Sequence, residues 1–208
     1  MKKIYLLIFF FFTLNTFVIS KEPKLQEIFS GLNSPWSLSF INENLILISE
    51  KSGTLVLVDL KDKKIKKIEH NLNILEDGQG GLLEVLFFNN RVFVSYSENL
   101  KKGYSSTSVA TAKFNENFLN FENIFKSEPP INSGYHFGSR LVIKDNLLYV
   151  TVGERGKGMI AQDPTKHPVS IVRIHLDGKI PKNNPKFKDL MEILDTNFNI
   201  TLRKKYAN

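Results

Sequence analysis

The chain has 208 residues, of which 42% are hydrophobic and 24% charged, a composition typical of a folded globular protein. Its net charge of +7 is spread along the sequence, apart from one lysine-rich run at residues 61–67, so it does not predict a nucleic-acid-binding face. The absence of cysteine excludes disulfides, thiolate metal sites and cysteine nucleophiles.

The chain begins with the layout of a secretory signal peptide, which we assign to residues 1–20. Two lysines precede an apolar run from Ile4 to Phe12, and the small residue Ser20 ends the leader. We expect cleavage near Ser20 and a soluble mature chain that is periplasmic or secreted. An uncleaved N-terminal anchor is the alternative, because the apolar stretch extended to Ile19 just reaches the length needed to cross a bilayer.

From residue 21 onward, apolar and polar residues alternate over short runs, which is the pattern of half-buried β-strands. Tight turn sequences such as Asn89-Asn90 and Asp145-Asn146 separate the runs, and helix signals are nearly absent. The lysine-rich run around Ile65 is predicted to be a solvated outer strand whose charges discourage edge pairing. The other predicted strands, in chain order, are residues 36–40, 45–49, 54–58, 82–87, 92–96, 108–114, 141–143, 147–152 and 171–176.

A repeat organises these strands, because Glu50, Glu98 and Glu154 each follow the second strand of a similar unit. Their separations of 48 and 56 residues are in the range of four-stranded β-propeller blades with insertions. The predicted fold class is therefore all-β, a β-propeller, and a β-sandwich with coincidental spacing is the alternative. At about 50 residues per blade the chain holds about three to four blades, fewer than most closed propellers, so we expect a truncated propeller.

Glycine-rich loops in front of two predicted strands carry the candidate functional residues. In a propeller, such loops gather around the central channel, where a ligand would bind. The segment Gly78-Gln79-Gly80-Gly81 allows positive φ, so Gln79 can reach a pocket as a hydrogen-bonding amide; a plain turn would also explain the glycines. His136 can accept a proton from a substrate hydroxyl near neutral pH, and packing beside Phe137 in a structural role is the alternative.

Other candidate residues carry weaker signals. Arg140 could hold an anion or brace its loop through backbone carbonyls, and we adopt the second interpretation. Residues 153–158 resemble a phosphate-binding loop in composition only, because the spacing to Gly-Lys-Ser/Thr and the following helix are missing. The sequence contains no Gly-x-Ser-x-Gly elbow, His-Glu-x-x-His motif or aspartate-rich calcium loop, which argues against a serine or metal hydrolase.

Motifs in chain order resemble the soluble glucose/sorbosone dehydrogenase family, whose members are exported quinoproteins. The resemblance covers residues 31–185 and rests on Gly31-Leu32-Asn33-Ser34-Pro35-Trp36-Ser37-Leu38, Gly78-Gln79-Gly80-Gly81-Leu82-Leu83, His136-Phe137-Gly138-Ser139-Arg140-Leu141, Gly153-Glu154-Arg155-Gly156, Ala161-Gln162-Asp163 and Leu176-Asp177-Gly178-Lys179-Ile180-Pro181-Lys182-Asn183-Asn184-Pro185. It implies a six-bladed propeller that binds pyrroloquinoline quinone (PQQ) and calcium at its mouth. It also implies oxidation of the anomeric carbon of aldose sugars to lactones.

The resemblance implies roles for two residues of this chain. His136 would take the proton from the C1 hydroxyl while C1 delivers hydride to the quinone, and Gln79 would hydrogen-bond at the cofactor and substrate site. Calcium would polarise the quinone carbonyl as a Lewis acid through oxygen ligands. The family draws its calcium ligands, and the residues that bind the cofactor carboxylates, from its second half, so we assign no metal ligand here.

The sequence departs from the family pattern at three places. Tyr135 stands where relatives often carry His or Asp, and His167-Pro168-Val169-Ser170 replaces a stretch that usually contains glycine. Residues 191–208 form an atypical tail that does not match the family; a frameshift, a premature stop and a genuine end of the protein are all consistent with it. Residues 21–190 are therefore expected to be the N-terminal portion of a PQQ-dependent aldose dehydrogenase.

This portion is expected to be inactive by itself, with unclosed sheet edges that allow self-association. The alternative is a non-catalytic exported half-propeller that completes itself by dimerisation or with a partner chain. The sequence does not indicate which sugar is preferred or what accepts the electrons.

Overall fold

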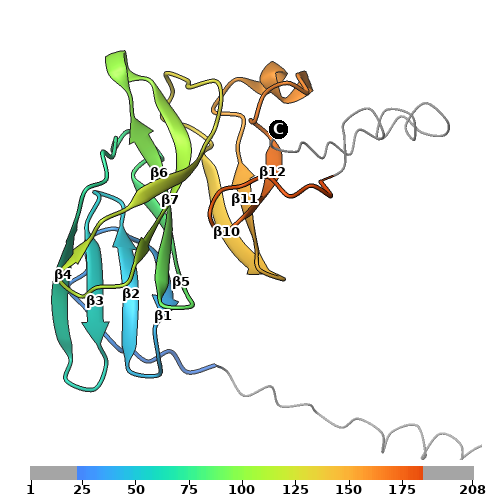
Figure 1. The fold of residues 1–208 in the computed structure, drawn as a ribbon. Helices are drawn as coiled ribbons and strands as arrows, with labels where there is room; N and C mark the ends of the chain where they lie inside the picture. The colour runs from blue at the N-terminus through green and yellow to red at the C-terminus, as the bar shows by residue number, and fades with distance from the viewer. Residues whose placement is uncertain (1–22, 185–208) are drawn as a thin grey trace, which may run out of the picture. The chain divides into compact units, whose positions relative to one another are not determined.

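The structure is a computed structural model that describes residues 23–184, so the predicted signal peptide and tail lie outside the described residues (Figure 1). Contacts divide the chain after Ser30, and residues 23–30 carry no regular secondary structure. All the strands described below belong to the unit that begins at Gly31. Within residues 23–184, no helix has the length and hydrophobicity required to cross a bilayer.

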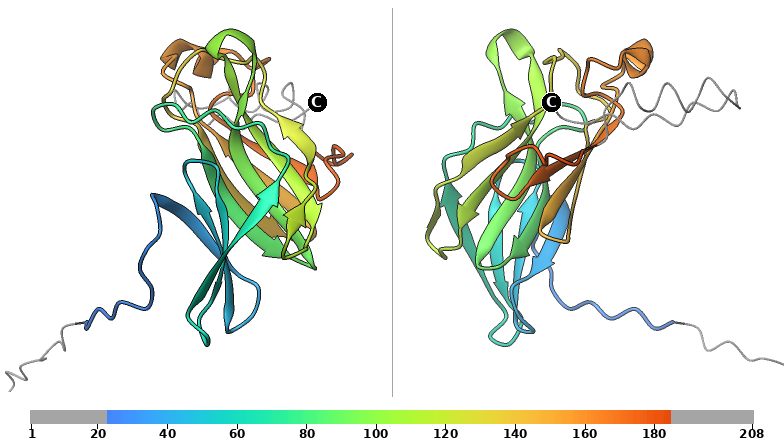
Figure 2. Two further views of the ribbon diagram at one scale, coloured as in Figure 1. Left: turned by 90° about the vertical axis from the view of Figure 1, so that its left-hand side faces the viewer. Right: turned by 45° about the vertical axis from the view of Figure 1, so that its right-hand side comes forward.

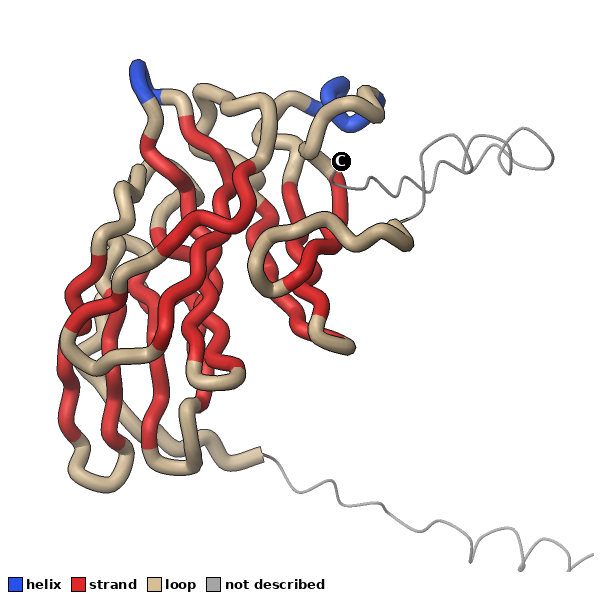
Figure 3. The backbone as a smooth tube through the Cα atoms, in the orientation of Figure 1, coloured by secondary structure: helices blue, strands red, loops and turns tan. Residues whose placement is uncertain are grey.

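The strands form three sheets, which follow one another along the chain except for one two-residue strand that returns to the first sheet. Loops and two short 3-10 helices connect the strands (Figure 3). The first sheet contains β1 (Pro35–Phe40), β2 (Leu45–Glu50), β3 (Leu55–Asp59) and β4 (Lys64–His70), with β8 (Phe118–Leu119) parallel to β4. The second contains β5 (Leu82–Phe88), β6 (Arg91–Asn99), β7 (Ser105–Lys113) and β9 (Glu122–Lys126). The third contains β10 (Gly138–Lys144), β11 (Leu147–Val152) and β12 (Ser170–His175). The 3-10 helices are η1 (Lys101–Gly103) and η2 (Gly158–Gln162).

Each predicted strand is present, with ends shifted by a few residues. The turns Asn89-Asn90 and Asp145-Asn146 have positive φ at both residues, between 48° and 57°, as in the type I′ turns that match the twist of a hairpin. The lysine-rich strand is confirmed as β4, of which four of the first five residues are exposed. Strands β8 and β9 were not predicted, because β8 is only two residues long and β9 contains glutamate and asparagine, which have low strand propensity.

The second sheet packs against both of the others (Figures 1 and 2). Strand β5 contacts β1 and β2, and β10 contacts β5, β6 and β7. One apolar core, which includes Leu47, Leu55 and Val94, joins the first and second sheets, while another, which includes Phe93 and Val150, joins the second and third. Three sheets with two cores between them are inconsistent with a β-sandwich, so the predicted all-β, propeller-type fold is confirmed, with three blades among the described residues.

The three sheets begin in the same way, because the first strand of each contains a β-bulge. The irregularities lie between Pro35 and Ser37, between Leu82 and Val85, and between Gly138 and Leu141. Bulges redirect side chains and are frequent beside functional sites.

Buried hydroxyl groups connect each sheet to the next one. Ser49 Oγ of β2 donates to the Leu83 carbonyl of β5 at 2.5 Å, and Ser95 Oγ of β6 donates to the Ser139 carbonyl of β10 at 2.6 Å. These bonds hold the bulged first strands of the second and third sheets against their neighbours. They therefore fix the loops that precede β5 and β10.

Candidate functional site

The loops in front of β5 and β10 meet each other. The backbone N–H of His136 donates to Gln79 Oε1 at 2.9 Å, although the two residues are 57 positions apart in the sequence. The backbone N–H of Gln79 donates in turn to the Gly134 carbonyl at 2.7 Å. The structure thus brings together the two residues that the sequence singled out, and their chemical roles remain predictions.

The imidazole of His136 is paired with a carboxylate. Its Nδ1 is hydrogen-bonded to Oε1 of Glu154, which follows the end of β11. In a neutral ring, Nδ1–H donates to this carboxylate and Nε2 keeps the lone pair that can accept a proton. The hydrogen bond with His136 lowers the pKa of the Glu154 carboxyl group, which is therefore ionised at neutral pH.

The adjacent residue, Arg155, fixes the backbone of the same loop. Its side chain is buried, and its guanidinium carbon lies 3.5 Å from the centroid of the Phe137 ring. Nε donates to the Tyr135 carbonyl at 3.0 Å, and Nη2 donates to the Ser133 carbonyl. Nη1 and Nη2 reach the carbonyl and the hydroxyl of Ser105 at 3.1 and 2.8 Å. Arg155 thus ties the loop that carries His136 to the start of β7.

Burial also affects the charge of this side chain. Desolvation lowers the pKa of Arg155 to about 10, although the nearby charge of Asp77 opposes the shift. The guanidinium is therefore still a cation at neutral pH. Its hydrogen bonds to carbonyl oxygens and its contact with an aromatic face compensate for the hydration that the guanidinium loses on burial.

The prediction that Arg140 braces this loop was wrong. Its Nη1 donates to Oε2 of Glu84 at 2.5 Å, and its side chain is 64% exposed. Arg140 lies within β10, beside the first strand of the second sheet, so its side chain reaches β5. The brace is Arg155, because the chain after β11 runs next to the loop before β10.

Glu154 and Arg155 were not predicted as site residues, although the repeat contains a signal for Glu154. Glu50, the counterpart of Glu154 in the first sheet, accepts the backbone N–H of Asn33 at 2.6 Å. Asn33 precedes β1 by two residues, just as His136 precedes β10. A glutamate at or just beyond the end of the second strand therefore binds the loop before the first strand in both sheets.

Unusual backbone conformations accompany this arrangement. His136 and Arg155 are non-glycine residues with φ of 50° and 57°, and such conformations cluster at functional sites because the surrounding contacts maintain them. Gly153 approaches the same loop, and an added Cβ there would be 1.9 Å from the His136 carbonyl oxygen. The close approach of the two segments therefore requires glycine at position 153.

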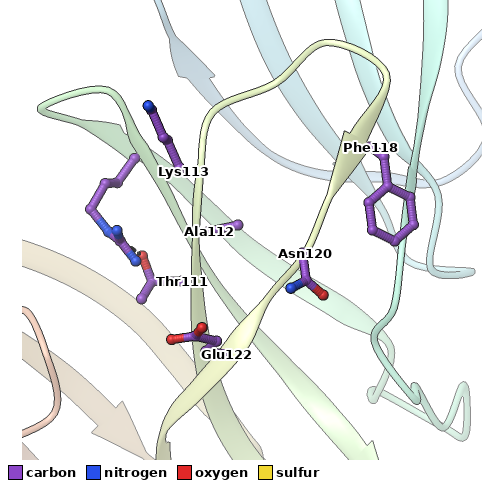
Figure 4. A pocket seen from close by; sticks show the side chains of 7 residues that line it. Thr111, Ala112, Lys113, Phe118, Asn120 and Glu122 are labelled. Carbon is purple, nitrogen blue, oxygen red and sulfur yellow. Dashed lines mark hydrogen bonds between the residues drawn. The ribbon is translucent and has the colours of Figure 1, made fainter.

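A hollow of about 310 Å³ lies elsewhere, between β7, β8 and β9 (Figure 4). Most of the side chains that line it are polar or charged, among them Arg91, whose Nε donates to Thr111 Oγ1 at 3.2 Å. Strand β7 begins at Ser105, beside Arg155, and ends at Lys113, beside this hollow. Because a strand rises about 3.3 Å per residue, the hollow is about 25 Å from the His136 loop and does not belong to that site.

Within residues 23–184, no group of three or more His, Asp or Glu residues is arranged to hold a metal ion. The ionic groups close to His136 act on the loop: Glu154 on its imidazole and Arg155 on its backbone.

A sequence model of the family described as Glucose / Sorbosone dehydrogenase matches residues 32–195, well over half of the chain. The chain belongs to the glucose/sorbosone dehydrogenase family. It is 30% identical over 168 residues to the aldose sugar dehydrogenase YliI of Escherichia coli, an alignment that covers 76% of the chain and 45% of the relative. Identity to the quinoprotein glucose dehydrogenase B of Acinetobacter calcoaceticus is 27% over 208 residues, covering 82% and 43%.

Solved structures of the family share the fold. A glucose dehydrogenase crystal structure superposes with a TM-score of 0.74 at 32% identity, covering 78% of this chain and 50% of that one. The apo-form of the soluble aldose sugar dehydrogenase from Escherichia coli gives a TM-score of 0.74 at 29% identity, covering 79% and 50%. The chain therefore spans about half the length of these relatives, and the resemblance drawn from its motifs is confirmed.

Proposed function

We propose that the chain is the N-terminal part of an exported PQQ-dependent aldose dehydrogenase in which His136 is the catalytic base. The observation that carries this proposal is the pairing of the His136 imidazole with Glu154, in the loop bonded to Gln79. The names of the relatives, an aldose sugar dehydrogenase and a quinoprotein glucose dehydrogenase, supply the substrate and cofactor classes. A structure of the PQQ-bound aldose sugar dehydrogenase from Streptomyces coelicolor shares the fold, with a TM-score of 0.69.

His136 and Glu154 act together on the proton of the sugar. With Nδ1 bonded to Glu154, Nε2 accepts the proton of the C1 hydroxyl, and the ionised carboxylate stabilises the imidazolium that forms. The carboxylate also holds the ring in one orientation. The side chain of His136 is 53% exposed, so a sugar can reach Nε2 from solvent.

Gln79 acts through both ends of its amide. Its Oε1 is used by the backbone of His136, which leaves the NH₂ group to donate to an oxygen of a bound ligand. An amide donor beside an imidazole suits the carbonyl edge of a quinone, so Gln79 would help to hold PQQ. When bound, PQQ supplies the acceptor for the hydride that leaves C1. Calcium ligands would come from residues outside the described part.

The proposal predicts that the 208-residue chain has no turnover by itself, because it spans less than half the length of its curated relatives. The assay uses purified chain with PQQ, calcium, glucose and a dye acceptor. If the chain does turn over and His136→Ala abolishes this activity, the claim that the chain is incomplete is wrong. The same result would support His136 as the base.

The base itself is tested in a chimera that joins residues 31–184 to the remaining half of the Escherichia coli relative. We expect PQQ-dependent glucose oxidation, with kcat lowered about 10²- to 10⁴-fold by His136→Ala, the usual contribution of a general base. His175→Ala is the matched control, because His175 is exposed at the end of β12 and should leave kcat unchanged. Equal kcat in both variants would refute the assignment of His136.

A further inference from the structure

The hydroxyl bonds between sheets follow a repeated geometry that shows how one sheet docks on the next. Ser49 lies opposite the bulge of its own first strand, and its Oγ donates to the carbonyl of Leu83, the residue inside the bulge of β5. Ser95 likewise lies opposite the bulge of β5, and its Oγ donates to the carbonyl of Ser139, inside the bulge of β10. The donor is therefore on the second strand of one sheet, and the acceptor is in the bulged first strand of the sheet that follows.

The third sheet carries the same donor. Thr151 of β11 lies opposite the bulge of β10, as Ser95 lies opposite that of β5. Its Oγ1 accepts the backbone N–H of Arg140 at 3.0 Å, just as Ser95 Oγ accepts that of Glu84 at 3.1 Å. Within residues 23–184, the Thr151 hydroxyl has no acceptor. The part of the chain that the structure describes thus ends with a docking hydroxyl that no further sheet uses.

The apolar side chains around this hydroxyl also lack a covering sheet. The cross-strand neighbours of the three docking hydroxyls are Leu55, Val109 and Ile171, in that order. Leu55 and Val109 are fully buried in the cores between sheets, whereas Ile171 is 57% exposed. Val142 shares the face of Ile171 and is 52% exposed. The outer face of the third sheet is therefore a docking surface of the same kind as those used by the first two sheets, and it is open.

The matching surface is on the first sheet, at the other end of the row of sheets (Figures 1 and 2). Trp36 is inside the bulge of β1, the position that Leu83 and Ser139 hold in β5 and β10. Leu38 and Phe40 follow Trp36 on the same exposed face. Among the three bulged first strands, β1 is the one that receives no docking hydroxyl from the residues described.

We propose that the first sheet of a second copy of this chain docks on the outer face of the third sheet. The Thr151 hydroxyl donates to the Trp36 carbonyl of the second copy, and the exposed face of β1 covers Val142 and Ile171. One chain carries both surfaces, so a second copy supplies the bulged acceptor and the apolar face that the existing sheet contacts require. The proposal concerns assembly and does not depend on the proposed oxidation.

The symmetry of this contact determines the size of the assembly. Two different surfaces meet, so the contact is heterologous and produces a closed ring or an open filament. Two copies joined at both ends contain six sheets, because each copy contributes three. Closed propellers have about four to eight blades, so we expect the ring to close with two copies.

Sedimentation equilibrium of the 208-residue chain should show a mass that rises with concentration from one chain to two and no further. Ile171→Glu should raise the Kd of the dimer at least about a hundredfold, because it places an unpaired charge in the apolar contact. Met159→Glu is the matched control, because Met159 is an exposed apolar residue in η2, outside the three sheets. It should change the Kd less than about twofold.

The docking hydroxyl has its own pair of variants. Thr151→Val should raise the Kd about three- to tenfold, the range expected for one hydrogen bond, and Thr151→Ser, which keeps the hydroxyl, should stay within about twofold. Thermal unfolding of each variant at a concentration where the chain is monomeric verifies that it folds. A Kd that is the same in Thr151→Val and Thr151→Ser would remove this hydrogen bond from the contact.

Mixing two variants tests whether the contact is head to tail. Leu38→Lys alters only the β1 face and Ile171→Glu only the third sheet, so each variant alone should remain monomeric. In an equimolar mixture, one contact joins the two unaltered surfaces and the other joins the introduced opposite charges. We therefore expect the mixture to dimerise. A β1 face that pairs with itself would instead let Ile171→Glu dimerise alone, which would overturn the proposal.

Three other results would also contradict it. A mass of one chain at all concentrations would show that a different protein covers these faces. A mass that grows beyond two chains would show that the ring does not close. Equal Kd values for Ile171→Glu and Met159→Glu would exclude the third sheet from the contact. None of these measurements involves PQQ, a sugar or turnover, so their outcome is separate from that of the oxidation assays.

Discussion

Two neighbouring residues, Glu154 and Arg155, hold the loop that presents His136. Glu154 contacts the imidazole. Arg155 contacts backbone carbonyls that precede His136 in the chain and the ring of Phe137, which follows it. A rigid loop matters for a general base, because proton transfer requires hydrogen-bond distance and alignment. The two side chains therefore control whether His136 is correctly placed.

Replacing Arg155 with lysine should destabilise the fold by about 2–3 kcal/mol, because lysine keeps the charge but cannot make the forked hydrogen bonds of the buried guanidinium. The measurement is the free energy of unfolding in urea. Arg91→Lys is the control, since Arg91 is partly exposed and its side chain has one hydrogen bond, to Thr111. This variant should lose less than about 1 kcal/mol of unfolding free energy. Equal losses would show that Arg155 does not brace the loop.

The pairing of Glu154 predicts a pH-dependent contribution to stability. Its pKa in the folded chain lies below the ordinary value of 4.5, so its contribution is present above 4.5 and disappears as the pH falls through the lowered pKa. At about pH 7, Glu154→Gln should lose up to about 1 kcal/mol, as expected for a partly exposed pair, and the difference from the unaltered chain should shrink as the pH is lowered below 4.5. A difference that does not shrink as the pH falls would contradict this pairing.

At the scale of elements, the register between β10 and β11 places the segment before β10 in contact with the segment after β11. Gly138 pairs with Val152, and the backbone N–H of Gly153 donates to the Phe137 carbonyl at 3.1 Å. The residues that follow β11 therefore run directly against those that precede β10. This pairing explains why residues about 18 positions apart form one site.

Gly153→Ala tests this close approach. The added methyl group would overlap the His136 carbonyl oxygen, so the two segments must separate, and we expect a loss of about 1–3 kcal/mol in unfolding free energy. Gly158→Ala, in η2, is the matched control, because nothing lies within 4 Å of its added Cβ. The NMR chemical shifts of residues 133–137 should differ from those of the unaltered chain in Gly153→Ala but not in Gly158→Ala. Similar spectra for the two variants would argue against the contact.

The sequence predicted the elements whose pattern is local and missed those that depend on distant partners. Strands such as β6 and β11 show alternating residues and turn signals, whereas β8 exists through its parallel pairing with β4. Gln79 and His136 were found because glycines surround them. Arg155 was missed because its role depends on Ser105, 50 positions away, which no local pattern reveals.

At the scale of the whole molecule, the first sheet keeps an apolar surface. Trp36, Leu38 and Phe40 alternate along β1 and therefore share one face, and they are 46%, 55% and 57% exposed. Exposed apolar surface of this kind drives association. We propose that the self-association predicted from the sequence uses this face of β1.

Sedimentation velocity should show that the weight-average mass of the 208-residue chain rises with concentration. Leu38→Lys should shift this rise to at least about tenfold higher concentration, because a buried contact of this size is worth about 1.5–3 kcal/mol. Tyr104→Lys is the matched control, because Tyr104 is 44% exposed in a loop after η1. A mass that stays constant with concentration would contradict the prediction.

The hydroxyl bonds between sheets bear on how the chain folds during synthesis. Ser49 needs an acceptor 34 residues further along, and Ser95 needs one 44 residues further along. A ribosome adds about 5–20 residues per second, so each donor waits about 2–9 s for its acceptor to be made. The first and second sheets are thus each docked by the first strand of the next sheet, and each stays without this bond until that strand has been made.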